Sequence, residues 1–367
     1  MAHSRHTILI LNSAQSRYPR GDDPWVEATV RAYARLAGGA ATAITSTEPL
    51  MWDFGVFLAA EQGMNIRHIP PEYDPGRAEA MFGETVSAFG VDEGRAGPLY
   101  LKTQRGLSRG DVWRLRDITA IRAADVIYPV AIRPGGRLET MLQTEPLRAE
   151  VNNDFAIPWG TRIRRTPAYD FADAKLNPLP DGDWLVHWTR SSPGPWPGET
   201  APEFFRDLLA RPAVYVRSAR ETLVRILAKR VIRASSWKIP GQTPVVSLTE
   251  NTPETAVTLM RWRKRFVRYT YEPYGVAIRR EALARVGAKK VVYAVRAGDP
   301  GADAWKTQSP GVVSDWTRER EWRHPGDVSL DALDPGDWFA IVPGQSDAAY
   351  LESALGADVR TFVLFVV

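Results

Sequence analysis

Strand-like and helix-like segments alternate along the first third of the chain, and this alternation restricts the fold more than any other feature. Short apolar runs typical of buried strands are each followed by a segment with helical spacing of apolar residues. The expected order is strand, helix, strand, helix, strand over residues 7–11, 25–36, 41–46, 52–62 and 65–69. Such alternation predicts an α/β domain with a Rossmann-like parallel sheet and right-handed crossovers.

The alternation resumes after residues 70–110, whose prolines and glycines predict an irregular insertion. A helix is expected over residues 113–124, a strand over 125–132 and another helix from Arg137. Pro134-Gly135-Gly136 lies between the last two. Backbone N–H groups and the helix dipole point outward at such a helix start, so this turn is a candidate anion site. A plain turn is the alternative, because many strand–glycine–helix junctions bind nothing.

Ligands of parallel sheets lie beyond the carboxyl ends of the strands, which places Asn12-Ser13 and Ser46 at the expected mouth. With Arg116 and Pro134-Gly135-Gly136, their order resembles the LOG/DprA-like (SLOG) superfamily of Rossmannoid nucleotide-binding domains, over about residues 5–150. The resemblance implies nucleotide-binding roles for Asn12, Ser13, Ser46, Arg116, Gly135 and Gly136.

The phosphoribohydrolase members of that superfamily carry a P-G-G-x-G-T-x-x-E motif, whose last glutamate acts on the glycosidic bond. This chain has Leu138 at the later glycine position and Leu142 at the glutamate position, and Glu139 is out of register. The resemblance therefore implies that the first domain recognises a nucleotide-type ligand and does not hydrolyse it.

Residues 151–183 lack sustained periodicity and read as a connection between a domain over residues 1–150 and an α+β domain over residues 184–367. In the second domain we expect helices over 203–209 and 217–231. The expected strands are 184–189, 244–249, 274–278, 290–295, 338–342 and 360–367.

Composition narrows the chemistry. The 367 residues include no cysteine, which excludes disulfides, thiolate nucleophiles and cysteine-based metal sites, and we predict no metal. The formal charge of +4 permits contact with phosphates without requiring it. The apolar run at residues 8–11 is too short for a signal peptide or a membrane span, so we expect a soluble, cytoplasmic protein with no membrane partner. Whether it forms a homo-oligomer stays open.

Two carboxylates stand one residue apart in Glu319-Arg320-Glu321-Trp322-Arg323. In an extended strand, alternate residues project from the same face, so Glu319 and Glu321 would reach one pocket together. A salt-bridged strand is the plain interpretation, and a catalytic pair is the other.

The motifs of the second domain resemble an uncharacterised domain family found in abortive-infection and other phage-defence proteins, over about residues 184–345. They are Leu223-x-x-Ile226-Leu227, Ile232-Arg233-Ala234-Ser235, Val245-Val246-Ser247-Leu248-Thr249-Glu250, Met260-Arg261-Trp262, Tyr274-Gly275-Val276-Ala277-Ile278, Val292-Tyr293 and Glu319-Arg320-Glu321-Trp322-Arg323. This resemblance implies a context of bacterial conflict and antiviral defence, and no particular reaction.

A strand histidine, a threonine two residues on, later aromatic residues and a final glutamate also resemble the layout of ADP-ribosyltransferase folds. That layout implies that His187 and Thr189 hold the ribose of NAD and that Tyr274 or Tyr293 stacks on nicotinamide. Glu321 would be the catalytic carboxylate, assisted by Glu319, and His187 is the third predicted catalytic residue. The predicted substrate-binding residues are Thr189, Arg190, Ser247, Tyr274 and Tyr293. A single strand histidine is more often structural, which is the alternative for His187.

Two functions follow. The first is an enzyme that cleaves or transfers at an N-glycosidic bond of NAD or another nucleotide. The alternative is a non-catalytic, nucleotide-sensing defence protein whose second domain binds a partner or nucleic acid. Arg261–Arg268 mixes basic and aromatic residues as nucleic-acid-binding segments do, although a solvated helix face has the same composition.

Overall fold

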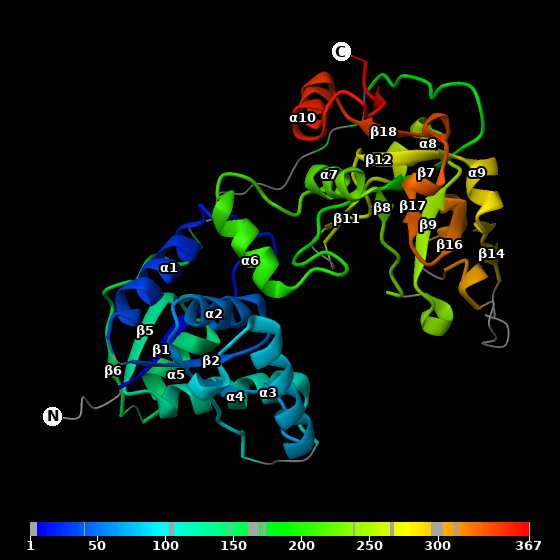
Figure 1. Cartoon of the computed structure of the whole chain (residues 1–367). Coiled ribbons are helices and arrows are strands. Elements are labelled where there is room, and N and C mark those ends of the chain that lie inside the picture. Colours follow the sequence, from blue (N-terminus) through cyan, green and yellow to red (C-terminus); the bar gives the residue numbers. More distant parts are fainter. Residues whose placement is uncertain are drawn as a thin grey trace. The chain divides into compact units, whose positions relative to one another are not determined.

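The computed structural model describes residues 6–39, 41–102, 106–146, 148–160, 169, 171, 174–237, 239–264, 268–294, 304–311 and 315–366. The chain forms two compact units, shown in Figure 1. The first comprises Met1–Arg165 and Gly198–Val216, and the second comprises Thr166–Pro197 and Arg217–Val367.

The first unit contains a six-stranded parallel sheet, which confirms the predicted Rossmann-like α/β fold. Its strand order is β4-β3-β2-β1-β5-β6. The strands are β1 (Thr7–Asn12), β2 (Thr42–Ser46), β3 (Asn65–Ile69), β4 (Ala96–Pro98), β5 (Val126–Ala131) and β6 (Glu150–Val151). The chain proceeds from β1 outward to β4 and then returns to the other side of β1, so the strand order reverses between β1 and β5.

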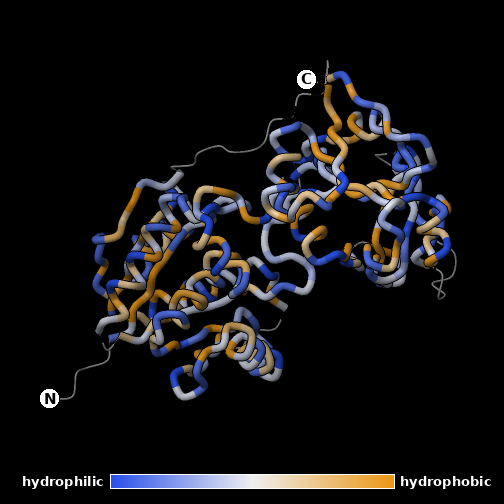
Figure 2. Tube along the Cα trace, turned by 45° about the horizontal axis from the view of Figure 1, so that its top comes forward, coloured by the Kyte–Doolittle hydropathy of each residue, from blue (hydrophilic) through white to orange (hydrophobic). Residues whose placement is uncertain are grey.

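Helices cover both faces of this sheet, as the alternation of strand side chains requires. They are α1 (Pro24–Ala37), α2 (Leu50–Glu61), α3 (Pro75–Phe89), α4 (Arg109–Ala123) and α5 (Arg137–Thr144). Ile8 and Ile10 of β1 pack in one core with α1 and α2, and Leu9 and Leu11 pack in another with α4 and α5. Figure 2 shows hydrophobic residues along these central strands.

Helix α3 falls within residues 70–110, which were expected to be irregular, so that prediction is wrong. The Asp74 side chain accepts a hydrogen bond from the backbone N–H of Arg77 at 2.9 Å, and Pro75 opens the helix. Gly90 ends it in the left-handed conformation, with φ of 60°. The prolines and glycines of this stretch therefore lie at the ends of a helix and in the segment before β4. They do not form a structureless insertion.

Helix α6 (Ala201–Ala210) belongs to the first unit, although the sequence analysis placed it in the second domain. Phe204, Phe205 and Leu208 join the core that α1 and α2 share, and the Phe205 and Phe54 ring centroids lie 5.1 Å apart. The helix is amphipathic, and its sequence carries no sign of which sheet its apolar face will cover.

The second unit contains a seven-stranded mixed sheet of order β13-β16-β9-β7-β12-β18-β19. The strands are β7 (Trp184–Trp188), β9 (Val245–Thr249), β12 (Gly275–Arg279), β13 (Lys289–Lys290), β16 (Glu321–Pro325), β18 (Trp338–Val342) and β19 (Thr361–Val363). Leu185, Val276 and Leu248 face a core that includes α7 (Ala219–Lys229), α9 (Arg280–Arg285) and α10 (Gln345–Leu355). Val186 and Trp188 face the other core, which includes α8 (Pro253–Leu259).

Short paired segments complete this unit. They are β8 (Val231–Ile232) with β17 (Val328–Ser329), β10 (Trp262–Arg263) with β11 (Arg268–Tyr269), and β14 (Val292–Tyr293) with β15 (Thr307–Gln308). The strand expected over residues 290–295 is therefore two short strands, β13 and β14. The solvated helix considered for Arg261–Arg268 is instead an antiparallel hairpin, of which residues 265–267 lie outside the described residues.

In the described part of the chain, no helix combines the length and the apolar content needed to cross a membrane.

Candidate functional site

At the mouth of the first sheet, two predicted ligand residues bind neighbouring strands. The Ser13 backbone N–H donates to the Ala131 carbonyl at 3.0 Å, and its hydroxyl accepts from the Arg133 N–H at 2.9 Å. The Ser46 hydroxyl donates to the Ile69 carbonyl at 2.6 Å. Both side chains are buried, so they join the ends of β1, β5, β2 and β3 in this structure.

Arg116 is also used inside the fold, with only 1% of its surface exposed. Its guanidinium donates to the Asp117 carboxylate at 3.0 and 2.8 Å and to the Thr47 carbonyl at 2.9 Å, and it also donates to the Glu48 carbonyl. It lies 4.7 Å from the centre of the Trp52 ring. These contacts hold the loop that follows β2.

The Gly135-Gly136 turn uses its own amides. The Gly135 N–H donates to the Glu139 carboxylate at 2.7 Å, and the Gly136 N–H donates to the Arg133 carbonyl at 2.9 Å. Gly135 has φ of 64°, which a glycine adopts without strain. An internal carboxylate thus takes an amide that was predicted to bind a phosphate. Asn12 differs: its amide donates to the Thr29 hydroxyl at 3.0 Å, while its buried Oδ1 has no hydrogen-bond partner among the described residues.

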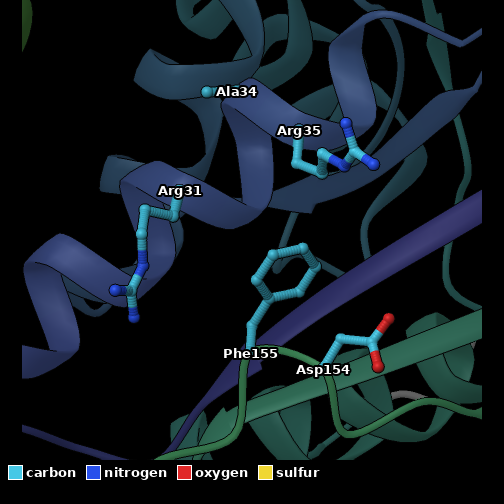
Figure 3. Close-up of a pocket in the computed structure, with 5 residues that line it drawn as sticks. All are labelled: Arg31, Ala34, Arg35, Asp154 and Phe155. Atoms are coloured by element: carbon cyan, nitrogen blue, oxygen red, sulfur yellow. The ribbon is translucent and has the colours of Figure 1, made fainter.

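A shallow pocket in the first unit was not predicted. Figure 3 shows Arg31, Ala34 and Arg35 of α1 on one side of it and Asp154 and Phe155 of the loop after β6 on the other. Arg31 and Arg35 lie one helical turn apart on an exposed helix face. Such spacing is common on solvated helices, so the sequence did not indicate a pocket here.

In the second unit, Glu321 forms a two-point ion pair with Arg323. The Arg323 Nε and Nη2 atoms lie 2.9 and 2.8 Å from the two carboxylate oxygens of Glu321. Only 3% of the Arg323 side chain is exposed, and its Nη1 donates to the Trp305 carbonyl at 2.7 Å and to the Thr307 carbonyl at 3.1 Å. The structure therefore gives Glu321 the salt-bridged arrangement that the sequence analysis held as one of two interpretations.

Glu319 is different, because it lies outside the strand. It ends a 3-10 helix (Trp316–Glu319), and Arg320 then adopts the left-handed conformation with φ of 46°. The prediction that strand alternation aligns Glu319 with Glu321 is therefore wrong, since only Glu321 is in extended structure. The Glu319 backbone is fixed instead by Thr249, whose hydroxyl donates to its carbonyl at 2.5 Å.

The Glu319 carboxyl makes no hydrogen bond or ion pair with the residues that the structure describes. Burial raises its pKa to about 7, and the negative charge of Glu321 adds to this rise. The positive charges of Arg263, Arg323 and Arg190 oppose it. A carboxyl in this state exchanges its proton near neutral pH, which suits a general acid or base.

Tyr271 lies near this carboxyl, and Trp188 lies beside Tyr271. The Tyr271 hydroxyl and the Trp188 Nε1 are buried and have no hydrogen-bond partner among the described residues. Their rings stack with centroids 6.3 Å apart, and burial followed by the charge of Glu319 raises the pKa of Tyr271. Tyr293 accepts the Glu321 N–H at 3.2 Å, and burial raises its pKa to about 12.

Strand register adds Ser247 to this side of the sheet. Ser247 of β9 is paired with Arg323 of β16, and Thr249 is paired with both Glu321 and Val186. Ser247 is exposed although β9 lies inside the sheet. The structure thus brings Glu319, Glu321, Tyr293, Arg190 and Ser247 of the predicted residues into one region.

The other predicted residues lie elsewhere. His187 follows Val186, so alternation places it on the opposite face from Glu321, where its Nδ1 lies 2.9 Å from the Ser247 carbonyl. Burial lowers the pKa of His187. The buried Thr189 hydroxyl donates to the Ala219 carbonyl at 2.9 Å, and the Tyr274 hydroxyl donates to Asp347 at 3.0 Å. These side chains support the packing of α7 and α10.

The sequence analysis missed Tyr271, Trp188 and the individual role of Arg263. Tyr271 comes from the loop before β12, Trp188 from β7 and Arg263 from β10. Only the fold of the second unit brings Tyr271 and Arg263 to Glu319 and Trp188 to Tyr271. In the described ranges, no group of three histidine, aspartate or glutamate side chains is placed to hold a metal ion.

Fold and site together define a class: a two-unit α/β protein with a Rossmann-like parallel sheet and a second, mixed sheet, next to which a half-buried glutamate has no partner among the described residues. In comparisons with known proteins, the chain matches no protein-family model and no curated protein.

Proposed function

We propose that the second unit is an enzyme that cleaves or transfers at the N-glycosidic bond of NAD or another nucleotide, with Glu319 as its acid–base group. The observation that carries the proposal is the contrast between the two carboxylates. Glu321 is neutralised by Arg323, whereas Glu319 has no partner among the described residues and a pKa raised to about 7.

The chemistry fits one carboxylate among arginines. Arg190 and Arg263 supply positive charge for a phosphate group, as guanidinium groups do in nucleotide sites. With NAD, the bond from ribose C1′ to the nicotinamide nitrogen breaks, and nicotinamide leaves neutral with the bonding electrons. Water or an acceptor hydroxyl bonds to C1′ and gives its proton to the Glu319 carboxylate, which also stabilises the positive charge that develops on the ribose. The Tyr271 hydroxyl can hold the acceptor or the ribose.

The first unit is proposed to recognise a nucleotide-type ligand at the ends of β1 and β5. The support is the reversal of strand order there and the unpartnered Oδ1 of Asn12. A phosphate at the Gly135 amide has to displace the Glu139 carboxylate. The resemblance of the second unit to phage-defence proteins is the basis for proposing a role in bacterial antiviral defence.

The test is to incubate the full chain with NAD and with common nucleotides and to separate the products by chromatography. Free base or a ribosylated product is expected, and Glu319→Gln should lower the rate by on the order of a hundredfold or more while the protein melts as wild type does. Full activity of Glu319→Gln would sink the assignment. If wild type yields no product from any of these compounds, the non-catalytic, nucleotide-sensing alternative stands.

A further inference from the structure

Two tryptophans and three arginines form a partly exposed cluster in the second unit, and two of the arginines act on the Glu319 carboxyl. Trp237 is 51% exposed, and the guanidinium carbons of Arg268 and Arg190 lie 4.5 and 5.8 Å from its ring centre. The Trp316 ring lies 5.9 Å from the guanidinium carbon of Arg263. We call Trp237, Trp316, Arg190, Arg263 and Arg268 the arginine–tryptophan surface.

This surface adjoins the candidate site through shared residues. Arg190 and Arg263 contact the tryptophan rings and are also two of the three cations that lower the pKa of Glu319. A ligand held by these two guanidinium groups therefore lies within reach of both an aromatic ring and the Glu319 carboxyl.

The β10–β11 hairpin extends the positive charge beyond these five residues. Arg261 and Lys264 are exposed on the same hairpin as Arg263 and Arg268. Two acidic side chains of this region already have cationic partners: Glu321 pairs with Arg323, and Glu250 pairs with Lys290 and Arg320. Several cations spread along a surface suit a chain of phosphates better than a single one.

We propose that the partner of this surface is a single-stranded nucleic acid, one nucleotide of which is the acceptor for the reaction at Glu319. The acceptor role of the nucleotide rests on the proposed function, whereas the binding of the strand does not. Bases stack on exposed aromatic rings while arginines follow the phosphates, and this requires base faces that a duplex keeps covered. The Trp237 ring is the first stacking position and Trp316 the second.

Binding is tested with the full chain and a fluorescein-labelled 20-nucleotide thymidine strand, by fluorescence anisotropy. The strand should bind more tightly than a blunt duplex of equal length, and its affinity should fall steeply between 50 and 200 mM salt. Trp237→Ala should weaken binding about 5- to 100-fold, and Trp237→Phe should restore most of the loss. Arg268→Gln should flatten the salt dependence.

Arg285→Gln is the matched control. Its guanidinium belongs to α9 and lies 3.3 Å from Asp337, so the change removes the same charge away from the arginine–tryptophan surface. It should leave strand affinity and salt dependence close to wild type.

Two outcomes overturn the inference. One is no binding of the strand at 50 mM salt. The other is that strand, duplex and heparin bind with equal affinity and that Trp237→Ala leaves these affinities unchanged. Such a result would mean that the surface recognises negative charge alone. The proposed function fails separately: a strand bound with the expected Trp237 dependence but never modified in the presence of NAD leaves the binding surface standing and removes the reaction. Conversely, turnover of free NAD without strand binding keeps the reaction and removes the strand.

Discussion

Glu319 and Glu321 are two positions apart, yet their carboxylates have different partners because different residues surround them. Glu321 lies in a strand beside a buried arginine and is held at two points. Glu319 ends a 3-10 helix just before the left-handed Arg320, and no cation among the described residues lies at bonding distance from its carboxyl. Residue type and spacing identified both carboxylates as candidates for a catalytic pair. They did not predict which one would be unpaired, because Arg323 is oriented by the carbonyls of Trp305 and Thr307, which come from another segment.

Arg263→Gln should raise the pKa of Glu319 above its value of about 7, because the change removes a positive charge that favours the carboxylate. Carbon-13 NMR of the Glu319 carboxyl measures this directly, and the pH at which the proposed reaction reaches half its maximum should rise with it. Arg261→Gln is the control, since the Arg261 Nε is bound to the Thr258 carbonyl at 2.8 Å. An unchanged midpoint in Arg263→Gln would show that Arg263 does not act on Glu319.

Asp53 of α2 gives a second residue-scale prediction, on stability. Burial raises its pKa from 3.8 to about 6, against the hydrogen bond that it accepts from the Glu48 N–H. A carboxyl with a raised pKa contributes stability below its unfolded pKa, and this is lost as pH rises through about 6. Asp53→Asn should therefore increase the free energy of unfolding by about 1 to 3 kcal/mol at pH 8 and leave it unchanged at pH 4.

Urea titration of both proteins at the two pH values measures this difference. Glu84→Gln serves for comparison, because it removes an exposed carboxylate from α3 and should have little effect at either pH. A variant that is no more stable than wild type at pH 8 would contradict the buried position of Asp53.

At the scale of elements, the sequence predicted what local signals control. The strands β1, β3 and β7 and the helices α1 and α5 follow the expected ranges closely, because period and capping residues are local properties. Helix α3 was missed because its proline and glycines were read as loop residues. The hairpin of β10 and β11 was not expected either, since alternating charge and aromatic residues fit a strand face as well as a helix face.

Helix α6 illustrates what lies beyond local signals, and it yields the prediction for this scale. Phe205→Ala should cost about 3 to 5 kcal/mol of stability, because its buried ring packs against Phe54 and Phe57 of α2. Arg206→Ala, next to it, removes a largely exposed ion pair with Glu61 and should cost less than about 1 kcal/mol. Equal effects of the two changes in thermal unfolding would place α6 outside the first core.

The whole molecule consists of two units whose chain segments alternate. The first unit takes residues up to Arg165 and then Gly198–Val216. A truncated chain of residues 1–165 therefore lacks α6 and should expose the rings of Phe54 and Phe57, bind the dye ANS and associate in size-exclusion chromatography. A chain in which residues 1–165 are joined to residues 198–216 by a short flexible linker restores that cover without exposing β7, and it should behave as a monodisperse folded protein. Identical behaviour of the two chains would mean that α6 is dispensable.

This alternation also sets an order of events on the ribosome. The first unit cannot close its apolar surface until residue 216 has emerged, and by then the β7 strand of the second unit is already outside the exit tunnel. During that interval an unfinished core and an unpaired central strand coexist in one nascent chain. A delay in translation that occurs while residues 188–216 are emerging from the tunnel should therefore reduce the yield of folded protein more than the same delay after residue 216 has emerged.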